Sequence, residues 1–345
     1  MTFKNELKNF LAEFEPYSQR YFRQKTKSVL KYPKLIKRFY ADLEDFMRGG
    51  KKLRAFLVYW GFKIAGGSNL KKILPVSFAF EMFHNFLLIH DDIADKSEKR
   101  RGEWAIHKLY EMDFGGHYGM SQAIIIGDIA CIEAFEIIAK SDFDPKLKEL
   151  IIQKLSEILL ETDYGQALDV EYSFKKPKLS DVWQVADLKS ARYSFVGPLT
   201  IGAQVARARA SQIEALTRFG SDVGIAFQLR DDVLGLFGQE NRLGKSTLSD
   251  LREGKNTLLV YKARELVSGR NRDQLDQIWG KESANKADLD RVRKIVTNCG
   301  ALKWCQTESE KLVQGAKLRI KKITSNPQYQ QILMDLADFV IMRDH

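Results

Sequence analysis

The chain has 345 residues, of which 44% are hydrophobic and 29% are charged, and this composition excludes disordered and fibrous proteins. Its 55 lysines and arginines exceed its 45 aspartates and glutamates, so the formal net charge is +10. Such a balance favours an anionic partner. A nucleic acid, an acidic membrane surface and a phosphorylated small molecule all meet that description.

Three cysteines without the paired short spacing of a zinc site predict a reduced, intracellular compartment. Residues 1–17 contain interspersed acids and no continuous apolar region, so we expect neither a signal peptide nor a transit peptide. Elsewhere no stretch offers the roughly 18 uncharged apolar residues of a membrane span. We therefore expect a cytoplasmic protein with no stable membrane insertion.

The apolar residues recur mainly at helical spacing, and strand signals are sparse. The segment 123–139, AIIIGDIACIEAFEIIA, contains no turn signal, so we predict one helix there rather than a strand. In 146–170, Leu147, Leu150 and Ile151 begin a stripe that matches one buried helical face. Breaks are predicted at 49–50, 66–67, 141–145, 175–178 and 235–254, and none resembles a long interdomain linker.

Residues 86–102, FLLIHDDIADKSEKRRG, carry a first acidic cluster. On a helix Asp91 and Asp95 lie one turn apart, where two carboxylates repel by roughly 3 kcal/mol at an effective dielectric near 20. One interpretation is a solvated face, in which Lys96 neutralises Asp92 and Lys99 neutralises Asp95. Asp91 has no such partner, so the alternative is a bound cation.

A second acidic cluster, FQLRDDVLGLFG, places Asp231 and Asp232 on another apolar helix with no basic residue four positions away. Carboxylates without nearby His or Cys favour Mg²⁺, which readily shares its coordination with substrate phosphates. Diphosphate is the expected bridge. Basic residues gather in three further stretches and together predict a pocket for two anions; they are Lys51, Lys52 and Arg54 in GGKKLR, Arg100 and Arg101, and Lys245 and Lys255.

Four motifs occur in the order GGKKLR, EMFHNFLLIHDDIADKSEKRRG, FQLRDDVLGLFG and GKSTLSDLREGKNTLL. In this order they resemble the motifs of the trans-isoprenyl diphosphate synthases, the polyprenyl synthetase family, over nearly the whole chain. The resemblance implies an all-α fold, a single large helical bundle around a deep central cavity known as the isoprenoid synthase type I fold. It also implies one domain over residues 1–345 and a homodimer.

The same resemblance implies a Mg²⁺-dependent prenyltransferase that condenses isopentenyl diphosphate head-to-tail with an allylic diphosphate. It implies three Mg²⁺ ions held by Asp91, Asp95 and Asp231, with Asp92 and Asp232 nearby, and no nucleic acid partner. Arg100, Lys189 and Lys245 would contact the allylic diphosphate, and Lys51, Arg54, His84 and Arg101 would hold isopentenyl diphosphate. Lys255 would also bind substrate. Ser190 and Gln228 would lie near the carbocation, supported by Gln166 and Asp169.

Several of these residues also have an ordinary structural interpretation. A lone histidine in an apolar run, such as His84, is often a core residue. Gln166, Asp169 and Ser190 also fit helix packing or capping. The chain departs from the family pattern at Gly235, where many relatives carry a third aspartate, and at Trp104 and Ala105.

Product length depends on the side chains that precede the first acidic cluster. Phe86, Phe83 and Phe80 are spaced by three, and Phe86 lies about 7.5 Å of helix rise before Asp91. In relatives a bulky aromatic residue five positions before the motif, with a smaller residue such as Leu87 after it, accompanies short products. We therefore predict geranylgeranyl diphosphate (C20).

Four alternatives remain open from the sequence. They are a farnesyl diphosphate (C15) synthase, a noncatalytic subunit of a heteromeric synthase, a terpene cyclase and a basic nucleic-acid binder. A cyclase needs no isopentenyl diphosphate site. A nucleic-acid binder spreads its lysines and arginines along a face instead of placing them beside carboxylates.

Overall fold

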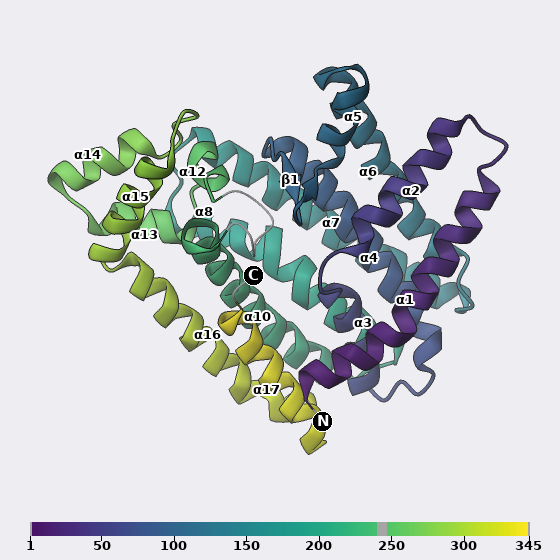
Figure 1. Cartoon of the computed structure of the whole chain (residues 1–345). Helices are drawn as coiled ribbons and strands as arrows, with labels where there is room; N and C mark the ends of the chain where they lie inside the picture. The colour runs from purple at the N-terminus through teal and green to yellow at the C-terminus, as the bar shows by residue number, and fades with distance from the viewer. Residues whose placement is uncertain (1, 240–246, 344–345) are drawn as a thin grey trace. The chain divides into compact units, whose positions relative to one another are not determined.

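The computed structural model describes residues 2–239 and 247–343, and almost every element in it is a helix (Figure 1). The first part contains α1 (Phe3–Ser28), α2 (Lys34–Arg48), α3 (Leu53–Ile64), α4 (Leu70–Ala94), β1 (Lys99–Arg100), β2 (Glu103–Trp104), α5 (Ile106–Phe114), α6 (Gly116–Ala139) and α7 (Pro145–Phe174). The second part contains α8 (Leu179–Val185), the π-helix η1 (Ala186–Val196), α9 (Gly197–Val205), α10 (Ala210–Phe237), α12 (Ser249–Glu253), α13 (Leu258–Leu266), α14 (Gly269–Ile278), α15 (Lys286–Asn298), α16 (Ala301–Ile323) and α17 (Pro327–Met342). The predicted all-α class is confirmed.

These elements form two compact units, and both units are discontinuous in the sequence. Unit 1 comprises Met1–Leu155, Pro198–Ile213 and Asn326–Ile332, and unit 2 comprises Ser156–Gly197, Glu214–Ser325 and Leu333–His345. The two acidic clusters therefore belong to different units, the first to unit 1 and the second to unit 2. That residues 1–345 are a single domain stays a prediction.

The core of unit 1 is built on aromatic side chains from α1, α3 and α4. The Phe10 ring lies 5.8 Å from the Phe56 ring, and the Phe14 ring lies 6.0 Å from the Phe78 ring. α4 has apolar residues on nearly all sides, as expected for a helix that is surrounded by other helices. By length and apolarity this helix meets the criteria for a membrane span, yet 78% of its most apolar window is buried within the protein, as in a core helix.

The C-terminus of α4 sets the geometry of the first acidic cluster. The Ser97 N–H donates to the Asp92 carbonyl at 2.9 Å, and the Lys96 N–H donates to the Ile93 carbonyl at 3.2 Å. Lys96 has a φ of +50°, so this ending is a Schellman motif with a lysine in the left-handed position that glycine usually takes. The helix stops directly after the aspartates, which places them at its end.

A two-residue hairpin follows, which the sequence pattern did not predict. Lys99 pairs with Trp104 and Arg100 pairs with Glu103. The turn residues Arg101 and Gly102 have φ values of +55° and +87°, as a type I′ turn requires at both central positions. The two arginines have different partners, since Arg100 contacts Asp92 and Arg101 contacts the Phe46 carbonyl.

Unit 2 packs around a core formed mainly by α10, α13, α15 and α16. Its buried residues include Leu229, Val233, Leu259, Val292 and Cys305. η1 runs beside α7, where a Cβ on Gly165 would lie 2.5 Å from the Lys189 backbone nitrogen. Glycine at position 165 therefore permits the close approach of α7 and η1. Two predicted site residues, Lys189 and Ser190, lie in η1. Such π-helical segments often occur at functional sites.

The longer helices agree with the sequence. α6 contains the whole of segment 123–139, and α7 contains segment 146–170, as predicted. The breaks predicted at 49–50, 66–67 and 175–178 are loops or turns, and so are residues 141–144, although Pro145 already begins α7. Of the break predicted at 235–254, Gly235 still lies within α10, and residues 240–246 lie outside the described residues.

Candidate active site

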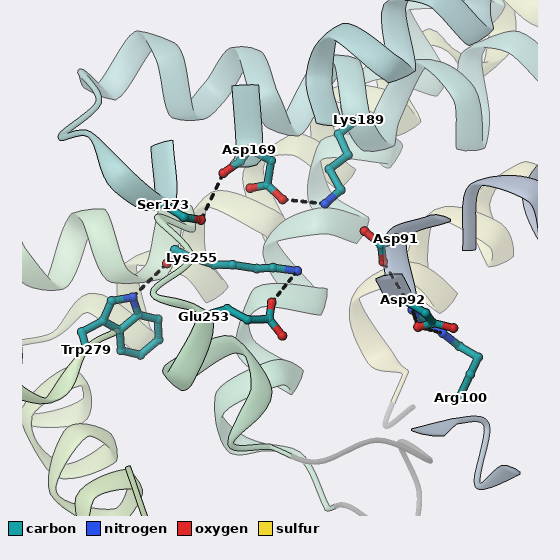
Figure 2. Close-up of polar contacts among 9 residues, drawn as sticks. All are labelled: Asp91, Asp92, Arg100, Asp169, Ser173, Lys189, Glu253, Lys255 and Trp279. Carbon is teal, nitrogen blue, oxygen red and sulfur yellow. Dashed lines mark hydrogen bonds and ion pairs between the residues drawn. The ribbon is translucent and has the colours of Figure 1, made fainter. Parts of the chain in front are cut away.

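Asp91, Asp92 and Arg100 form one cluster in unit 1 (Figure 2). The Arg100 Nε donates to Asp92 Oδ1 at 2.9 Å, its Nη2 also donates to Asp92, and Nη2 lies 3.3 Å from Asp91 Oδ2. Asp92 is thus neutralised by the hairpin arginine and not by Lys96. Asp95 follows as the C-cap residue of α4 and is half-buried.

Burial controls the ionisation of this cluster. It raises the pKa of Asp92 to about 6, although the Arg100 charge and its hydrogen bond pull the pKa down and the Asp91 and Asp95 charges push it up. Burial lowers the pKa of Arg100, but the carboxylates, Asp92 first, outweigh it and the net shift is upward. Arg100 is therefore a permanent cation. The cluster holds more negative than positive charge when all three acids ionise.

His84 and Arg54 form a second polar pair in unit 1. The Arg54 Nη1 lies 3.2 Å from His84 Nε2. Since an arginine only donates, Nε2 must accept and the histidine proton resides on Nδ1. Burial lowers the pKa of His84 well below its ordinary value, and the charges of Arg54, Arg101, Lys52 and Arg100 lower it further. His84 is therefore neutral and orients Arg54.

Arg101 completes this cationic region. Its Nη1 donates to the Phe46 carbonyl at 2.8 Å, and a Cβ on Gly49 would lie 2.5 Å from its Cδ, so the glycine allows the side chain to lie against the α2–α3 loop. Within the described part of the chain Arg101 has no ion pair. An anion bound beside His84 would supply the missing negative charge.

The two lysines of GGKKLR differ in their surroundings. Lys52 is buried with a φ of +52°, donates to the Gly49 carbonyl at 2.7 Å and pairs with Glu81 at 3.2 Å. It stabilises the start of α3 and is turned away from solvent. Lys51 is half-buried, and its role in substrate binding stays a prediction.

In unit 2, Asp232 is held in a polar network. The Gln228 Nε2 donates to Asp232 Oδ1 at 2.7 Å, the Ser190 hydroxyl donates to Gln228 Oε1, and the Leu258 N–H donates to Asp232 Oδ2 at 3.2 Å. Burial raises the pKa of Asp232 to about 8; the Gln228 hydrogen bond opposes this rise, while the charges of Asp231 and Asp250 add to it. The predicted residues Ser190, Gln228 and Asp232 are therefore brought together.

Asp231 has a partner that the sequence pattern did not reveal. The Arg343 Nη2 lies 2.7 Å from Asp231 Oδ1, and the Arg343 guanidinium lies 3.7 Å from the centre of the Phe227 ring. The Arg343 side chain is 9% exposed, whereas that of Asp231 is 50% exposed. No spacing rule links residues 112 positions apart. The carboxylate of Asp231 is therefore still accessible to solvent, although it lies beside the buried guanidinium of Arg343.

Asp250 is a further acid that the sequence pattern did not single out. A Cβ built on Gly235 would lie 2.0 Å from Asp250 Oδ2, so the carboxylate of Asp250 lies directly against Gly235. Many relatives place a third aspartate at position 235. Here a carboxylate from α12 lies next to the second acidic cluster instead. Asp250 stands inside the motif GKSTLSDLREGK, which was the available signal.

Two of the predicted lysines of unit 2, Lys189 and Lys255, make ion pairs (Figure 2). Lys189 Nζ lies 2.5 Å from Asp169 Oδ2, and Lys255 Nζ lies 3.1 Å from Glu253 Oε2. The Lys255 carbonyl accepts from Trp279 Nε1 at 3.0 Å, which anchors its backbone. Asp169 therefore orients Lys189, and its supporting role in catalysis stays a prediction. Gln166 is half-buried one turn before Asp169, and Lys245 lies outside the described residues.

Two of the proposed length-determining residues, Phe86 and Phe83, are buried in unit 1. The Phe86 ring lies 4.7 Å from the His90 ring, and the Phe83 ring lies 5.2 Å edge-on from Phe135 of α6. Leu87 is half-buried and Phe80 is buried. One of these ring contacts lies within α4 and the other joins α4 to α6; we call the two together the aromatic wall.

The donor set fits a hard divalent cation. The acidic residues of both clusters offer carboxylate oxygens, which are the ligands that Mg²⁺ prefers. Among residues 2–239 and 247–343, no three His, Cys, Asp or Glu side chains form a metal cage on their own. The ligand set Asp91, Asp95 and Asp231 draws on both units and stays a prediction.

Comparison with known proteins leads to the same family. Residues 36–296 match the family described as polyprenyl synthetase. The chain is 33% identical to a geranylgeranyl diphosphate synthase of Methanosarcina mazei over 86% of this chain and 87% of that protein. It is 32% identical to a geranylfarnesyl diphosphate synthase of Aeropyrum pernix over 88% and 93% of the two chains.

A solved structure extends the likeness to the whole chain. It is the geranylgeranyl pyrophosphate synthase of Corynebacterium glutamicum complexed with isoprenyl diphosphate and magnesium, with a TM-score of 0.92, 25% identity and coverage of 99% of this chain and 100% of that one. The resemblance found in the four motifs is thereby confirmed, and the chain belongs to the polyprenyl synthetase family, the trans-isoprenyl diphosphate synthases.

Proposed function

We propose that this prenyltransferase condenses isopentenyl diphosphate head-to-tail with an allylic diphosphate in a Mg²⁺-dependent reaction and releases geranylgeranyl diphosphate. One observation carries the proposal. Unit 1 combines the Asp91–Asp92–Arg100 cluster with a separate cationic region around neutral His84, formed by Arg54 and Arg101. A terpene cyclase has no use for this second anion site, whereas a condensing synthase binds two diphosphates.

Different residues of unit 1 would bind the two substrates. Arg54 and Arg101, helped by Lys51, would bind the diphosphate of isopentenyl diphosphate, and His84 would hold Arg54 in place. Arg100 would contact the allylic diphosphate from the hairpin. Its present contact with Asp91 and Asp92 keeps its guanidinium next to these carboxylates.

The metal would be held by the acidic clusters. Asp91, Asp95 and Asp231 would hold three Mg²⁺ ions, with Asp92 and Asp232 nearby. Mg²⁺ bound there would neutralise charge on the departing diphosphate. Lys189, Lys245 and Lys255 would add positive charge, and Asp169 would orient Lys189.

The chain then needs no nucleophilic side chain. The allylic carbon–oxygen bond breaks, the alkene of isopentenyl diphosphate attacks the resulting cation, and the released proton passes to the departing diphosphate. Ser190 and Gln228 would present polar oxygens to the positive charge, and buried apolar walls would exclude water.

A C20 product is the finer part of this proposal. The buried aromatic wall of Phe86 and Phe83, next to His90 and Phe135, supports a limit on the length of the growing prenyl chain. Leu87, beside Phe86, is smaller and would obstruct that chain less. The Methanosarcina mazei relative carries the name geranylgeranyl diphosphate synthase, which also supports this length.

We also propose that the working unit is a cytoplasmic homodimer. α6 exposes Met120, Ile124, Ile125 and Ile132, and such an apolar surface is suited to a second copy of the chain. Sedimentation analysis of wild type and of Ile125→Asp/Ile132→Asp tests this surface. A wild-type monomer at micromolar concentration would contradict it.

The function is tested by product analysis. Purified protein is incubated with Mg²⁺, isopentenyl diphosphate and each of the dimethylallyl, geranyl and farnesyl primers, and the dephosphorylated alcohols are separated by chromatography. We expect geranylgeraniol from wild type and almost none from Asp91→Asn. Farnesol as the end product would support the C15 alternative, and no product with any primer would support a noncatalytic subunit.

A further inference from the structure

Residues 20–38, RYFRQKTKSVLKYPKLIKR, contain eight lysines and arginines and no aspartate or glutamate. This segment, which we call the basic turn, joins the end of α1 to the start of α2 in unit 1. It alone carries a charge of +8 in a chain whose net charge is +10. No step of the proposed reaction uses it.

Only two of the eight charges have acidic partners within the described residues. Lys25 pairs with Glu133 at 2.6 Å and also with Glu136, and Arg38 pairs with Asp42 at 3.3 Å and Asp113 at 2.5 Å. The other six are exposed and make no ion pair with any residue that the structure describes; they are Arg20, Arg23, Lys27, Lys31, Lys34 and Lys37. Six positive charges without acidic partners on one segment favour binding to a polyanionic surface.

A groove between α1 and α2 adds depth to this surface. Its volume is about 600 Å³, and its lining includes Arg23, Lys27, Lys37 and Arg48 with Leu30 and Glu44. Arg48 pairs with Glu44 at 3.4 Å and with Asp45 at 2.8 Å, so the three other cations remain to favour an anion. The volume falls in the range of roughly 300–1,000 Å³ typical of small-ligand sites, so the groove can admit a phosphorylated head group.

The tip of the basic turn is apolar and exposed. Leu30 is 64% exposed and Tyr32 is 53% exposed, while Val29 is buried and anchors the turn. The Lys31 ammonium lies 5.2 Å from the centre of the Tyr32 ring. The tip lies at the end of α1 opposite the N-terminus (Figure 1). Basic residues around an exposed Leu and Tyr are the pattern of an interfacial membrane contact, because tyrosine favours the head-group level.

We propose that the basic turn docks this protein reversibly on the surface of an anionic lipid bilayer. Leu30 and Tyr32 enter the head-group region, the six cations contact lipid phosphates, and the α1–α2 groove receives one head group. A contact of this kind needs no spanning helix, since charge attraction and two shallow apolar side chains act together. The inference stands apart from the proposed reaction, because it concerns binding and not catalysis.

Vesicle co-sedimentation tests the proposal on the full chain. We expect the wild type to bind vesicles of phosphatidylcholine mixed with phosphatidylglycerol, to ignore pure phosphatidylcholine, and to dissociate as salt is raised. Failure to bind either vesicle, or equal binding to both, would overturn it.

Charge removal locates the surface. The variant Lys27→Gln/Lys31→Gln/Lys34→Gln/Lys37→Gln should partition at least about tenfold more weakly into anionic vesicles. The matched control Lys294→Gln/Lys303→Gln/Lys321→Gln/Lys322→Gln removes four exposed lysines of unit 2 and should stay within about twofold of wild type. Unchanged thermal unfolding and prenyl transfer show that both variants are folded. Equal losses in the two variants would reduce the effect to net charge and contradict the proposal.

The apolar tip separates a membrane from other polyanions. Leu30→Ala/Tyr32→Ala should bind anionic vesicles several-fold more weakly yet bind inorganic tripolyphosphate as wild type does. Leu318→Ala, at a site 83% exposed in unit 2, is the control and should bind vesicles normally. Undiminished vesicle binding by the tip variant, or displacement of vesicles by duplex DNA at equal phosphate concentration, would overturn the proposal in favour of a general polyanion site.

Discussion

Gly235 and Asp250 touch across unit 2, and a Cβ at position 235 would lie only 2.0 Å from Asp250 Oδ2. α12 thereby brings a carboxylate against the helix that carries Asp231 and Asp232. The missing third aspartate of the motif is thus matched by an acid supplied from another element.

Restoring that aspartate should harm the protein. Gly235→Asp would force Asp250 aside and add another carboxylate beside Asp231 and Asp250, so we expect a loss of about 1–3 kcal/mol in the free energy of unfolding. Thermal unfolding measures it, with Gly235→Asp/Asp250→Ala as the variant that should recover much of the loss. Wild-type stability together with raised activity in Gly235→Asp would show that the site has room for the acid.

The stability of the unliganded protein should depend on Asp232. Its pKa is about 8 in the folded state against an ordinary value of 3.8, so the folded state holds a proton that the unfolded state has lost between these values. The free energy of unfolding should therefore fall as pH rises from about 4 to about 8. In Asp232→Asn, whose amide does not titrate, this part of the slope should vanish. Identical pH profiles of the two unfolding midpoints would refute the assignment.

His84 should act as a neutral acceptor over the physiological pH range. Because its pKa lies well below the ordinary value, the rate with limiting isopentenyl diphosphate should show no inflection near pH 6.5 that belongs to this residue. His84→Ala should raise the KM for isopentenyl diphosphate by about tenfold, as loss of one hydrogen bond to a charged group implies.

Two comparisons make the His84 prediction specific. The KM for the allylic primer should change little in His84→Ala, and His84→Gln should recover part of the loss because its amide oxygen can accept from Arg54. An inflection near pH 6.5 in wild type that is absent from His84→Gln would mean that the histidine titrates during turnover.

Arg343 should compete with divalent metal for Asp231. Their ion pair is partly exposed and worth about 0.2–1 kcal/mol, so Arg343→Ala should lower the Mg²⁺ concentration for half-maximal activity by up to about fivefold. Arg218→Ala removes an exposed pair with Glu214 and serves as the control. A higher Mg²⁺ requirement in Arg343→Ala would show that the arginine binds substrate instead.

Phe86→Ala should lengthen the product. The variant opens the aromatic wall beside His90, so with excess isopentenyl diphosphate we expect chains longer than C20. Loss of a buried ring costs about 3–5 kcal/mol, so Phe143→Ala, another buried phenylalanine of unit 1, controls for instability. An unchanged product distribution in Phe86→Ala would remove this residue from length control.

Features that depend on local pattern were predictable from the sequence. Segment 123–139 lacks a turn signal and is helical, and the four motifs in their order were sufficient to indicate the family. The pattern also singled out Arg100 and Asp92. It offered Lys96 as one possible partner of Asp92, because i,i+4 spacing is visible in a sequence and a hairpin contact is not.

Features that depend on the course of the backbone were beyond the sequence. Lys51 and Lys52 are adjacent and chemically alike, but the left-handed backbone of Lys52 turns its ammonium inward to Glu81. The pairs Asp231–Arg343 and Gly235–Asp250 join residues from different helices or from the chain end, and no periodicity connects them.

The central claim is prenyl transfer onto isopentenyl diphosphate. Incorporation of radiolabelled isopentenyl diphosphate into a C20 diphosphate, with farnesyl diphosphate as the primer, measures it directly. We predict incorporation in Mg²⁺, its loss in excess chelator and its return when Mg²⁺ is restored. Incorporation that is just as rapid in chelator, or no incorporation with Mg²⁺ present, would contradict the account.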